Sequence, residues 1–245
     1  MKLPFHWHAL LDFLRSRCVP GESVVDDVYR RGDVAVRFDG RKLVVNSDDP
    51  EVLARVRRLF DVDADVDAIA AHFARDRMLA PLLARNAGIR VPGAWDPFEV
   101  CVRAIVGQQV SVAGATTIMT RIVTRYGTSP ERIARARGTN IGMPAARWET
   151  IRSLARLVLE CGGHAAAFES AGMAGALQNI RGIGPWTANY IAMRVFRDAD
   201  AFPHTDLGIR KTFAMAPERE ILARAEAWRP WRAYAAMLLW RGGVQ

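Results

Sequence analysis

The stretch at residues 177–188 constrains the fold of this chain more than any other part of its sequence. Its sequence is LQNIRGIGPWTA, in which Gly182 and Gly184 flank one apolar residue between two segments with helical spacing, and Pro185 follows at a position typical of a first helical turn. Glycine tolerates positive φ and close backbone approach, so the stretch predicts two helices joined by a tight turn. The start of the second helix can bind a phosphate through its N–H groups and dipole. Any tight turn between helices favours glycine, however, so the glycines alone identify no function.

The rest of the sequence changes its hydrophobic period near Asp96-Pro97. Short alternating runs at 34–38 and 42–46 surround Asp39-Gly40 and predict a β-hairpin, to which a run at 23–30 could add a third strand. Helices are expected at 8–17, from Asp49-Pro50 to about residue 60, at 65–75, and after Asp96-Pro97 at 98–106, 110–126, 146–159, 186–196 and 231–240. The predicted fold class is α+β, a small N-terminal antiparallel sheet with helices followed by an all-α part, with no long linker.

Composition excludes several other classes of protein. The chain has 245 residues, of which 50% are apolar and 24% charged, so it is neither disordered, nor collagen-like, nor a disulfide-stapled mini-protein. Apolar stretches fall far short of the roughly 18 residues that a transmembrane helix needs, and charged residues interrupt the N-terminal segment, unlike a signal peptide. The cysteines Cys18, Cys101 and Cys161 show no ligand spacing and are expected to be reduced thiols. We expect a soluble cytoplasmic protein, associated with the nucleoid if it is bacterial, that does not bind membranes.

The positive charge is concentrated in the C-terminal three-fifths of the chain. Residues 1–100 carry 15 basic and 16 acidic side chains, whereas residues 101–245 carry 19 basic and 10 acidic ones. Such an excess is expected of a region that neutralises nucleic-acid phosphates. The chain has only three lysines among its 34 basic residues, so an arginine-rich composition is the other explanation, and charge alone does not decide between them.

Together with four other segments, residues 177–188 resemble the helix-hairpin-helix DNA glycosylase superfamily. The segment AFPHTDLGIR at 201–210 is similar to the loop that carries the catalytic aspartate of that superfamily. The segments VGQQVSV at 106–112, WRPWRAY at 228–234 and HWHALLDFL at 6–14 point to its AlkA-type 3-methyladenine DNA glycosylase II branch. The resemblance spans nearly the whole chain. It implies an N-terminal α+β domain at 1–78 similar to the TATA-binding protein, a helical domain at 98–200, and a second helical domain from 79–97 plus 201–245, with the active cleft between the helical domains.

The resemblance implies a base-excision repair enzyme. Such an enzyme flips an alkylated purine, 3-methyladenine above all, out of duplex DNA, hydrolyses its N-glycosidic bond and leaves an abasic site in an intact strand. Asp206 would be the catalytic residue, because a fixed carboxylate stabilises the positive charge of the oxocarbenium-like transition state. Asp is also a favoured N-cap, so Asp206 could cap a helix at 207–215, and the two roles are compatible.

The resemblance also implies an aromatic base pocket. Trp186 and Tyr190 lie one helical turn apart on one face, and an electron-rich ring favours a cationic base by roughly 0.5–2 kcal/mol. Aromatic side chains at helical spacing more often belong to the core, which we expect of Trp228 and Trp240. Leu207 stands where the family has an aromatic residue, which leaves the range of substrates open. The predicted pocket residues are Phe13, Trp186, Tyr190, Leu207 and Trp231.

DNA contacts and a cation site follow from the same resemblance. Gln109 stands where the family inserts an apolar wedge, so it would fill the gap left by the flipped base, although it could equally be a polar residue that ends a helical turn. Thr187 and the amides of residues 182–184 would hold backbone phosphate, and Arg181 and Arg210 could add contacts or remain solvated. Relatives often bind Na⁺ or K⁺ on hairpin carbonyls. The predicted DNA contacts are Gln109, Arg181, Gly182, Ile183, Gly184, Thr187 and Arg210, and the predicted carbonyl ligands are those of Gln178, Ile180 and Ile183.

Lyase chemistry and an iron–sulfur cluster are not expected. Related bifunctional enzymes carry a Schiff-base lysine just after the hairpin, where this chain has Trp186, and the three cysteines are too few for a four-cysteine cluster. We therefore expect a monofunctional enzyme that requires no cofactor and acts as a monomer on duplex DNA containing alkylated bases. One alternative is a non-catalytic helix-hairpin-helix module that only binds DNA or lesions. Another is a glycosylase of the same fold for deaminated or oxidised bases.

Overall fold

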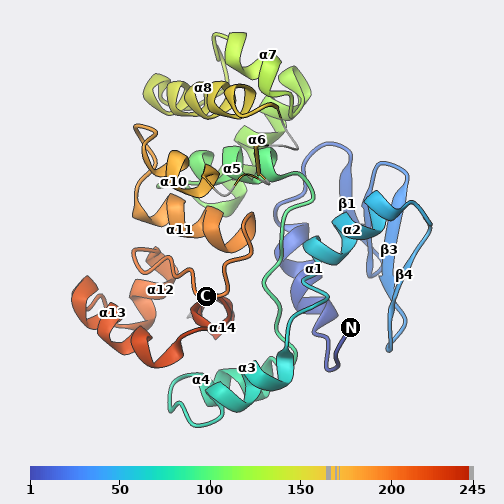
Figure 1. Cartoon of the computed structure of the whole chain (residues 1–245), viewed down its shortest axis with the longest axis vertical. Coiled ribbons are helices and arrows are strands. Elements are labelled where there is room, and N and C mark those ends of the chain that lie inside the picture. The colour runs from blue at the N-terminus through green and yellow to red at the C-terminus, as the bar shows by residue number, and fades with distance from the viewer. Residues whose placement is uncertain (164–166, 169, 171, 243–245) are drawn as a thin grey trace.

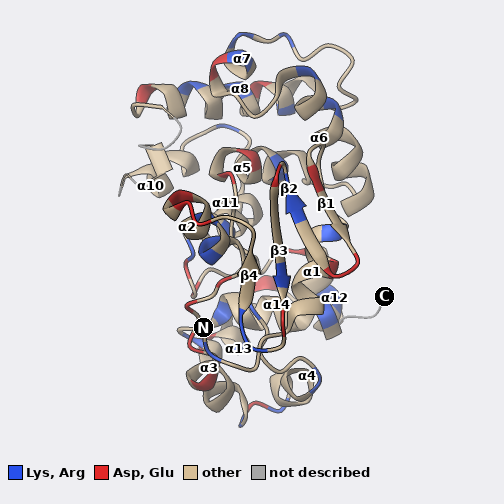
Figure 2. Cartoon of the chain, turned by 90° about the vertical axis from the view of Figure 1, so that its right-hand side faces the viewer, with Lys and Arg blue, Asp and Glu red and all other residues tan. Residues whose placement is uncertain are grey.

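A four-stranded antiparallel sheet and two helices form the N-terminal part of the chain (Figure 1). The computed structural model describes residues 1–163, 167–168, 170 and 172–242. The sheet consists of β1 (Glu22–Val25), β2 (Val28–Arg31), β3 (Val34–Phe38) and β4 (Leu43–Val45), paired in sequence order. Tyr29 is paired with Val24 on one side and Val36 on the other, and its side chain is fully buried. The helices are α1 (Trp7–Arg15) and α2 (Pro50–Leu59), and Figure 2 shows the sheet in front of the helices.

The sequence prediction of one strand at 23–30 is wrong, because the structure has two strands there. This segment contains parts of two strands, β1 and β2, because Asp26 and Asp27 both have positive φ, +48° and +58°, and form the turn of a tight hairpin. A turn with two left-handed residues matches the twist of the paired strands, and Asp tolerates this conformation better than most residues. The hairpin predicted around Gly40 is confirmed by the pairing of β3 with β4.

Helices form the rest of the chain, and the long ones agree with the apolar spacing of the sequence. Asp49 caps α2 and is followed by proline at the first helical position, as predicted, and Asp96 and Pro97 begin α5 in the same way. The remaining helices are α3 (Val66–Phe73), α4 (Leu79–Arg85), α5 (Pro97–Val106), α6 (Val112–Tyr126), α7 (Pro130–Arg135), α8 (Ala145–Glu160), α10 (Met173–Gln178), α11 (Pro185–Arg194), α12 (Leu207–Thr212), α13 (Glu218–Ala225), the 3₁₀ turn η1 (Glu226–Trp228) and α14 (Arg232–Gly242).

Helix α5 lies at the centre of the helical part. All its residues from Phe98 to Val106 are buried, and it packs against α6, α8 and α11. The buried side chains of α3, Val66, Ile69 and Phe73, belong to this larger core and not to the core under the sheet. Phe13 of α1 contacts both cores. The domain boundaries expected from the sequence remain predictions.

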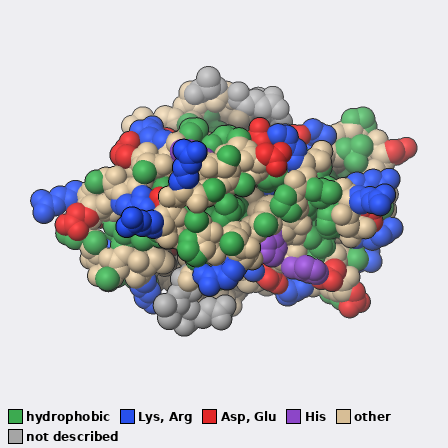
Figure 3. All heavy atoms as spheres, turned by 90° about the horizontal axis from the view of Figure 1, so that it is seen from below, with side chains coloured by type: hydrophobic (Ala, Val, Ile, Leu, Met, Phe, Trp, Pro, Cys, Tyr) green, Lys and Arg blue, Asp and Glu red, His purple; other side chains and the backbone are tan. Residues whose placement is uncertain are grey.

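Basic and acidic side chains are mixed over two of the faces in view. Figure 2 shows both basic and acidic positions on the sheet, and Figure 3 shows basic and acidic side chains interspersed with apolar ones at the α3–α4 end of the molecule. This agrees with the nearly balanced charge of residues 1–100. None of the helices in the described part of the chain combines the length and hydrophobicity needed to cross a bilayer.

Asp76 joins α4 to the C-terminal helices. Its carboxylate accepts hydrogen bonds from the amide N–H groups of Met78 and Leu79, from Arg224 at 2.5 Å and from the indole of Trp228 at 2.8 Å. Partial burial disfavours the charged form, but these hydrogen bonds outweigh it and lower the pKa of Asp76. Trp228 is fully buried, as predicted, so its N–H group has no water to replace this partner.

We predict that Asp76→Ala lowers the free energy of unfolding by about 2–3 kcal/mol, because it leaves the buried Trp228 N–H group unpaired. Since the pKa of Asp76 is lowered by folding, its charge stabilises the protein above the unfolded pKa of about 3.9, and this contribution is lost as the pH falls further. The stability gap between wild type and Asp76→Asn should therefore narrow below about pH 4. Urea unfolding at several pH values measures both effects.

Asp67→Ala is the matched control. The side chain of Asp67 makes an exposed ion pair with Lys2 at 3.6 Å, so its removal should cost less than about 1 kcal/mol. Equal losses for the two alanine variants would contradict the structural role of Asp76.

Candidate active site

Asp206 lies at the point where three helices meet. It is the N-cap of α12, and its Oδ1 atom accepts hydrogen bonds from the amides of Gly208 at 2.8 Å and Ile209 at 3.2 Å. The same oxygen accepts a hydrogen bond from Nε1 of Trp240 on α14 at 2.8 Å. The Oδ2 atom accepts one from Nε1 of Trp186 on α11, also at 2.8 Å. The predicted cap is therefore present, and the two indoles hold the carboxylate in one orientation.

Aromatic rings surround this carboxylate. Trp186 and Tyr190 stack with ring centroids 5.2 Å apart and planes 17° from parallel, as their spacing of one turn on α11 predicts. Trp240 lies against Tyr190 at 6.3 Å. In Figure 1, α11 lies directly above α12 and α14, which brings Trp186 and Tyr190 close to Asp206 and Trp240.

The structure places Trp240, not Trp231, against Asp206. Trp240 packs partly buried against the core, as the sequence suggested, and also donates directly to Asp206. Trp231 is likewise partly buried and makes an edge-to-face contact with Tyr234 at 5.8 Å, and its expected place in the pocket stays a prediction. No local signal distinguishes the two tryptophans, because the difference depends on which part of α14 faces α12.

Phe13 is close to the aromatic group but does not offer free ring faces. The guanidinium of Arg17 lies 3.7 Å from its ring centroid and that of Arg194 lies 4.7 Å from it. Arg194 is itself buried and donates a hydrogen bond to the hydroxyl of Tyr190 at 2.8 Å. Phe13 is therefore connected to the Trp186–Tyr190 stack through Arg194.

Three arginines set the electrostatics of Tyr190. Burial would raise the pKa of its phenol, but the positive charges of Arg194, Arg17 and Arg103 outweigh burial and lower that pKa. Arg194 also lies 5.5 Å from the centroid of the Tyr190 ring, so positive charge surrounds this side chain.

The predicted hairpin is present between α10 and α11. Gly182 has φ of +97°, and a Cβ atom there would lie 2.3 Å from Oγ1 of Thr150 on α8. The hydroxyl of Thr150 donates a hydrogen bond to the carbonyl of Arg181 at 3.0 Å, which holds the turn against α8. Ile183 packs partly buried against the core, and Gly184 is exposed as the N-cap of α11.

Thr187 differs from its expected role, since its side chain is 1% exposed. Its hydroxyl accepts a hydrogen bond from Nε2 of Gln108 at 2.9 Å, so the side chain faces the protein and not a ligand. Gln108 also donates to the carbonyl of Gly182 at 2.8 Å. Sequence reasoning missed Gln108. Its only signal was its place beside Gln109 in the segment VGQQVSV.

The other predicted contact residues lie around this region. Gln109 is exposed with φ of +59°, and Arg181 is exposed on the hairpin. Leu207 is 59% exposed beside Asp206. Arg210 follows one turn after Asp206, and its Nε atom is buried without a hydrogen-bond partner in the described part of the chain, so part of this side chain faces inward.

A metal ion could bind to side chains or to backbone carbonyls. Among the described residues, no group of three His, Cys, Asp or Glu side chains could hold a metal ion. The predicted carbonyl site is of a different kind. The carbonyl of Ile180 accepts the N–H group of Ile183 at 3.0 Å, which leaves its second lone pair for another partner and is compatible with a cation at the turn.

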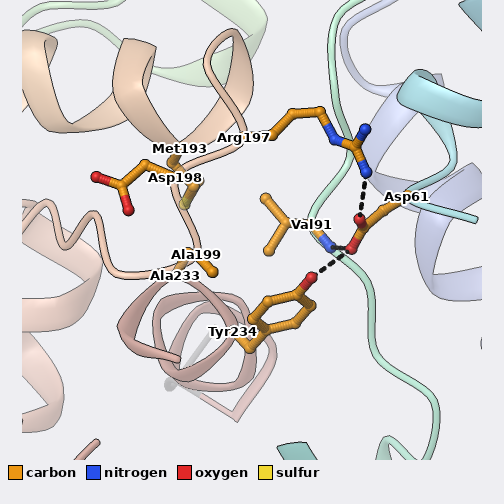
Figure 4. Close-up of a pocket in the computed structure, with 8 residues that line it drawn as sticks. All are labelled: Asp61, Val91, Met193, Arg197, Asp198, Ala199, Ala233 and Tyr234. Carbon is orange, nitrogen blue, oxygen red and sulfur yellow. Dashed lines mark hydrogen bonds and ion pairs between the residues drawn. The ribbon is translucent and has the colours of Figure 1, made fainter. Parts of the chain in front are cut away.

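A second buried carboxylate, Asp61, belongs to a structural junction. It accepts hydrogen bonds from the Val91 amide at 3.2 Å and the Tyr234 hydroxyl at 2.8 Å, and Arg197 lies 3.5 Å away (Figure 4). Burial raises the pKa of Asp61 despite these partners. Both hydrogen bonds reach Oδ2, and Oδ1 faces Arg197, so Asp61 joins the chain around Val91 to α14.

Comparison with known proteins agrees with this arrangement. The model of the AlkA N-terminal domain matches residues 1–96. The chain is 33% identical to DNA-3-methyladenine glycosylase 2 of Escherichia coli strain K12, over 97% of this chain and 94% of that protein. It is 34% identical to the probable bifunctional transcriptional activator/DNA repair enzyme AlkA of Mycobacterium tuberculosis over 98% of this chain, and it spans about half the length of that relative, 55%.

Solved structures show the same fold. A Clostridium acetobutylicum 8-oxoguanine glycosylase/lyase in complex with DNA superposes with a TM-score of 0.78 at 17% identity, covering 96% of this chain and 90% of that one. A DNA-3-methyladenine glycosidase from Bacillus halodurans superposes with a TM-score of 0.58 at 24% identity, covering 74% and 89%. The predicted fold class is confirmed.

We predict that Gly182→Ala destabilises the protein by about 2 kcal/mol or more, because its φ is strained for alanine and its Cβ would meet Thr150. Gly184→Ala is the matched control. Gly184 has φ of −91° and no atom within 4 Å of an added Cβ, so the change should stay within about 0.5 kcal/mol. Thermal unfolding of both variants tests this, and equal melting temperatures would contradict the hairpin geometry.

Proposed function

This chain belongs to the AlkA family of DNA-3-methyladenine glycosylases, and on that premise we propose that it is a monofunctional DNA glycosylase. It hydrolyses the N-glycosidic bond of alkylated purines, 3-methyladenine above all, in duplex DNA and leaves an abasic site. The observation that carries this proposal is the Asp206 carboxylate, held by two amide and two indole N–H groups beside stacked aromatic rings.

Asp206 acts on the charge that develops during bond cleavage. As the N-glycosidic bond breaks, positive charge builds on the deoxyribose, and a carboxylate already oriented by the protein stabilises that charge without reorganising. An alkylated cationic purine leaves as a neutral base, so no separate acid is required to protonate it. The electron-rich face of the partly exposed Trp186 binds the flipped cationic base by stacking, and the buried Tyr190 ring supports Trp186 from behind.

Duplex DNA is the proposed partner. The exposed hairpin supplies N–H groups at the start of α11 together with Arg181, which suits backbone phosphate. The buried Thr187 hydroxyl is replaced in this role by the hairpin backbone. We also propose that the carbonyls of Gln178, Ile180 and Ile183 bind Na⁺ or K⁺, which would add positive charge next to the phosphate.

The two alternatives are less well supported. A module that only binds DNA has no use for a fixed carboxylate, since negative charge repels phosphate, yet four donors orient Asp206 here. A lyase for oxidised bases needs an amine nucleophile, and Trp186 stands in the place after the hairpin where related lyases carry lysine. A non-lyase glycosylase for deaminated bases is the remaining alternative, and the base panel below includes its substrates.

We predict that Asp206→Asn lowers the rate of base release by at least about 100-fold, because it removes the negative charge that stabilises the transition state. Asn is a good N-cap and its oxygen can keep the donors on Oδ1, but its NH₂ group then faces the Trp186 N–H group, so the melting temperature is measured to check that the variant folds. The assay is chromatography of bases released from methylated duplex DNA, with abasic sites measured in parallel and deaminated and oxidised duplexes included.

The matched control for this experiment is Asp198→Asn, which removes one carboxylate from the preceding loop and should leave the rate within about twofold. If the wild type binds DNA tightly and releases no base from any substrate, the glycosylase proposal is wrong and the binding module is correct. If it releases only deaminated bases, the alkylation specificity is wrong.

A second pair of variants tests the pocket. Trp240→Phe loses the hydrogen bond to Asp206 and should slow base release by about tenfold or more, whereas Trp231→Phe should leave it within about twofold. Single-turnover kinetics on the same methylated duplex measure both rates. A larger loss of rate in Trp231→Phe than in Trp240→Phe would show that Trp231, and not Trp240, acts in the pocket.

A further inference from the structure

Gln108 occupies a position between the residue proposed to enter the duplex and the hairpin proposed to bind the phosphate. It follows Gly107, the C-cap of α5, and precedes Gln109. Its amide nitrogen donates to the Gly182 carbonyl at 2.8 Å and to the Thr187 hydroxyl at 2.9 Å. A carbonyl can only accept, so the nitrogen of this amide must face the hairpin, and both of its hydrogens are used.

The turn at residues 107–111 needs such an anchor. Gln109 has φ of +59°, a conformation that residues other than glycine seldom adopt and that persists when neighbouring groups hold it. Its own side chain is exposed and therefore supplies little packing. After Gln109 in the chain, Ser111 fixes the turn to α6 by accepting a hydrogen bond from the Gly114 amide at 3.1 Å. Before Gln109, the hydrogen bonds of Gln108 fix the turn to the hairpin.

The same turn contacts the base pocket. A Cβ atom at Gly107 would lie 3.6 Å from Cη2 of Trp186, so the backbone of the turn lies against the edge of that indole. Trp186 in turn donates its N–H group to Asp206. One glutamine side chain therefore fixes the turn carrying Gln109 relative to both the hairpin and the wall of the pocket.

We propose that Gln108 is a positioning residue. When the hairpin has bound the phosphate backbone, Gln108 holds Gln109 level with the gap that the flipped base leaves between its neighbouring base pairs. This inference rests on the proposed function. The amide of Gln108 faces the protein, so it does not itself contact DNA. Gln108 sets the distance between Gln109 and the hairpin that binds the phosphate. Gln109 can therefore enter the gap only when the hairpin has docked correctly on the DNA backbone.

The test uses gap filling, which requires no bond cleavage. A duplex carrying fluorescent 2-aminopurine beside a tetrahydrofuran abasic-site analogue reports unstacking when a side chain enters the gap. The full-length wild type should raise the fluorescence, and Gln109→Ala and Gln108→Ala should each lose most of that rise at saturating protein. Gln108→Glu should be at least as defective as the alanine variant, because an acceptor would then face two oxygen atoms.

Affinity separates positioning from simple structural support. We expect Gln108→Ala to bind undamaged duplex within about twofold of the wild type, because the hairpin still meets the phosphates, and to bind the abasic duplex about tenfold more weakly. The double variant Gln108→Ala/Gln109→Ala should be no worse than Gln109→Ala alone, since residues that act through one another are not additive.

Three results would overturn the proposal. They are a normal fluorescence rise in Gln108→Ala, equal losses of affinity for undamaged and abasic duplex, and additive losses in the double variant. A wild type that gives no fluorescence rise would also overturn it, because Gln109 would then not enter the gap. Base release from methylated duplex, measured separately, reports on the proposed function, so the two failures are distinguishable.

Discussion

The hydrogen bonds to the Asp206 carboxylate are the interaction on which the site depends. They come from the first turn of α12 and from indoles on α11 and α14, so one side chain joins three helices. A carboxylate at this junction would be unfavourable without donors, because burying charge costs free energy unless it is paired. The same donors that satisfy Asp206 also orient it. The helix cap predicted at Asp206 is therefore part of how this carboxylate is held.

Buried arginines connect this junction to the rest of the molecule. Arg194 donates to the carbonyls of Pro92 and Gly93 and to the hydroxyl of Tyr190, and Arg90 donates to the Asp61 carbonyl at 2.8 Å. Backbone carbonyls accept hydrogen bonds from both guanidinium groups in the interior, where an unpaired guanidinium would be costly, although the buried Nε atom of Arg90 has no partner in the described part of the chain. The chain around Val91 thereby packs between the N-terminal part and the aromatic stack. The N-terminal part contributes to the pocket through these contacts, although it supplies none of the donors to Asp206.

Local features of the sequence predicted many elements correctly. The Asp-Pro starts of α2 and α5, the Gly-Ile-Gly turn and the Trp186–Tyr190 face depend on residues within about one helical turn of one another. The predictions failed where a local pattern had two solutions. The run at 23–30 suits one long strand as well as two short ones, and the choice depends on left-handed Asp26 and Asp27, which carry no glycine signal. Gln108 escaped notice because its partners lie on a segment more than seventy residues away.

The sequence by itself determined the α+β class, the helix-hairpin-helix turn and the capping position of Asp206, since capping, turn chemistry and hydrophobic period are properties of neighbouring residues, whereas the proposed catalytic role of Asp206 rests on the family resemblance. Only the tertiary structure decided which tryptophan meets that carboxylate. Trp231 immediately precedes α14 and Trp240 lies within it, and the packing of α14 against α12 brings Trp240 to Asp206, 34 residues away along the chain. Contacts between distant segments depend on how whole helices pack, and no short stretch of sequence carries that information.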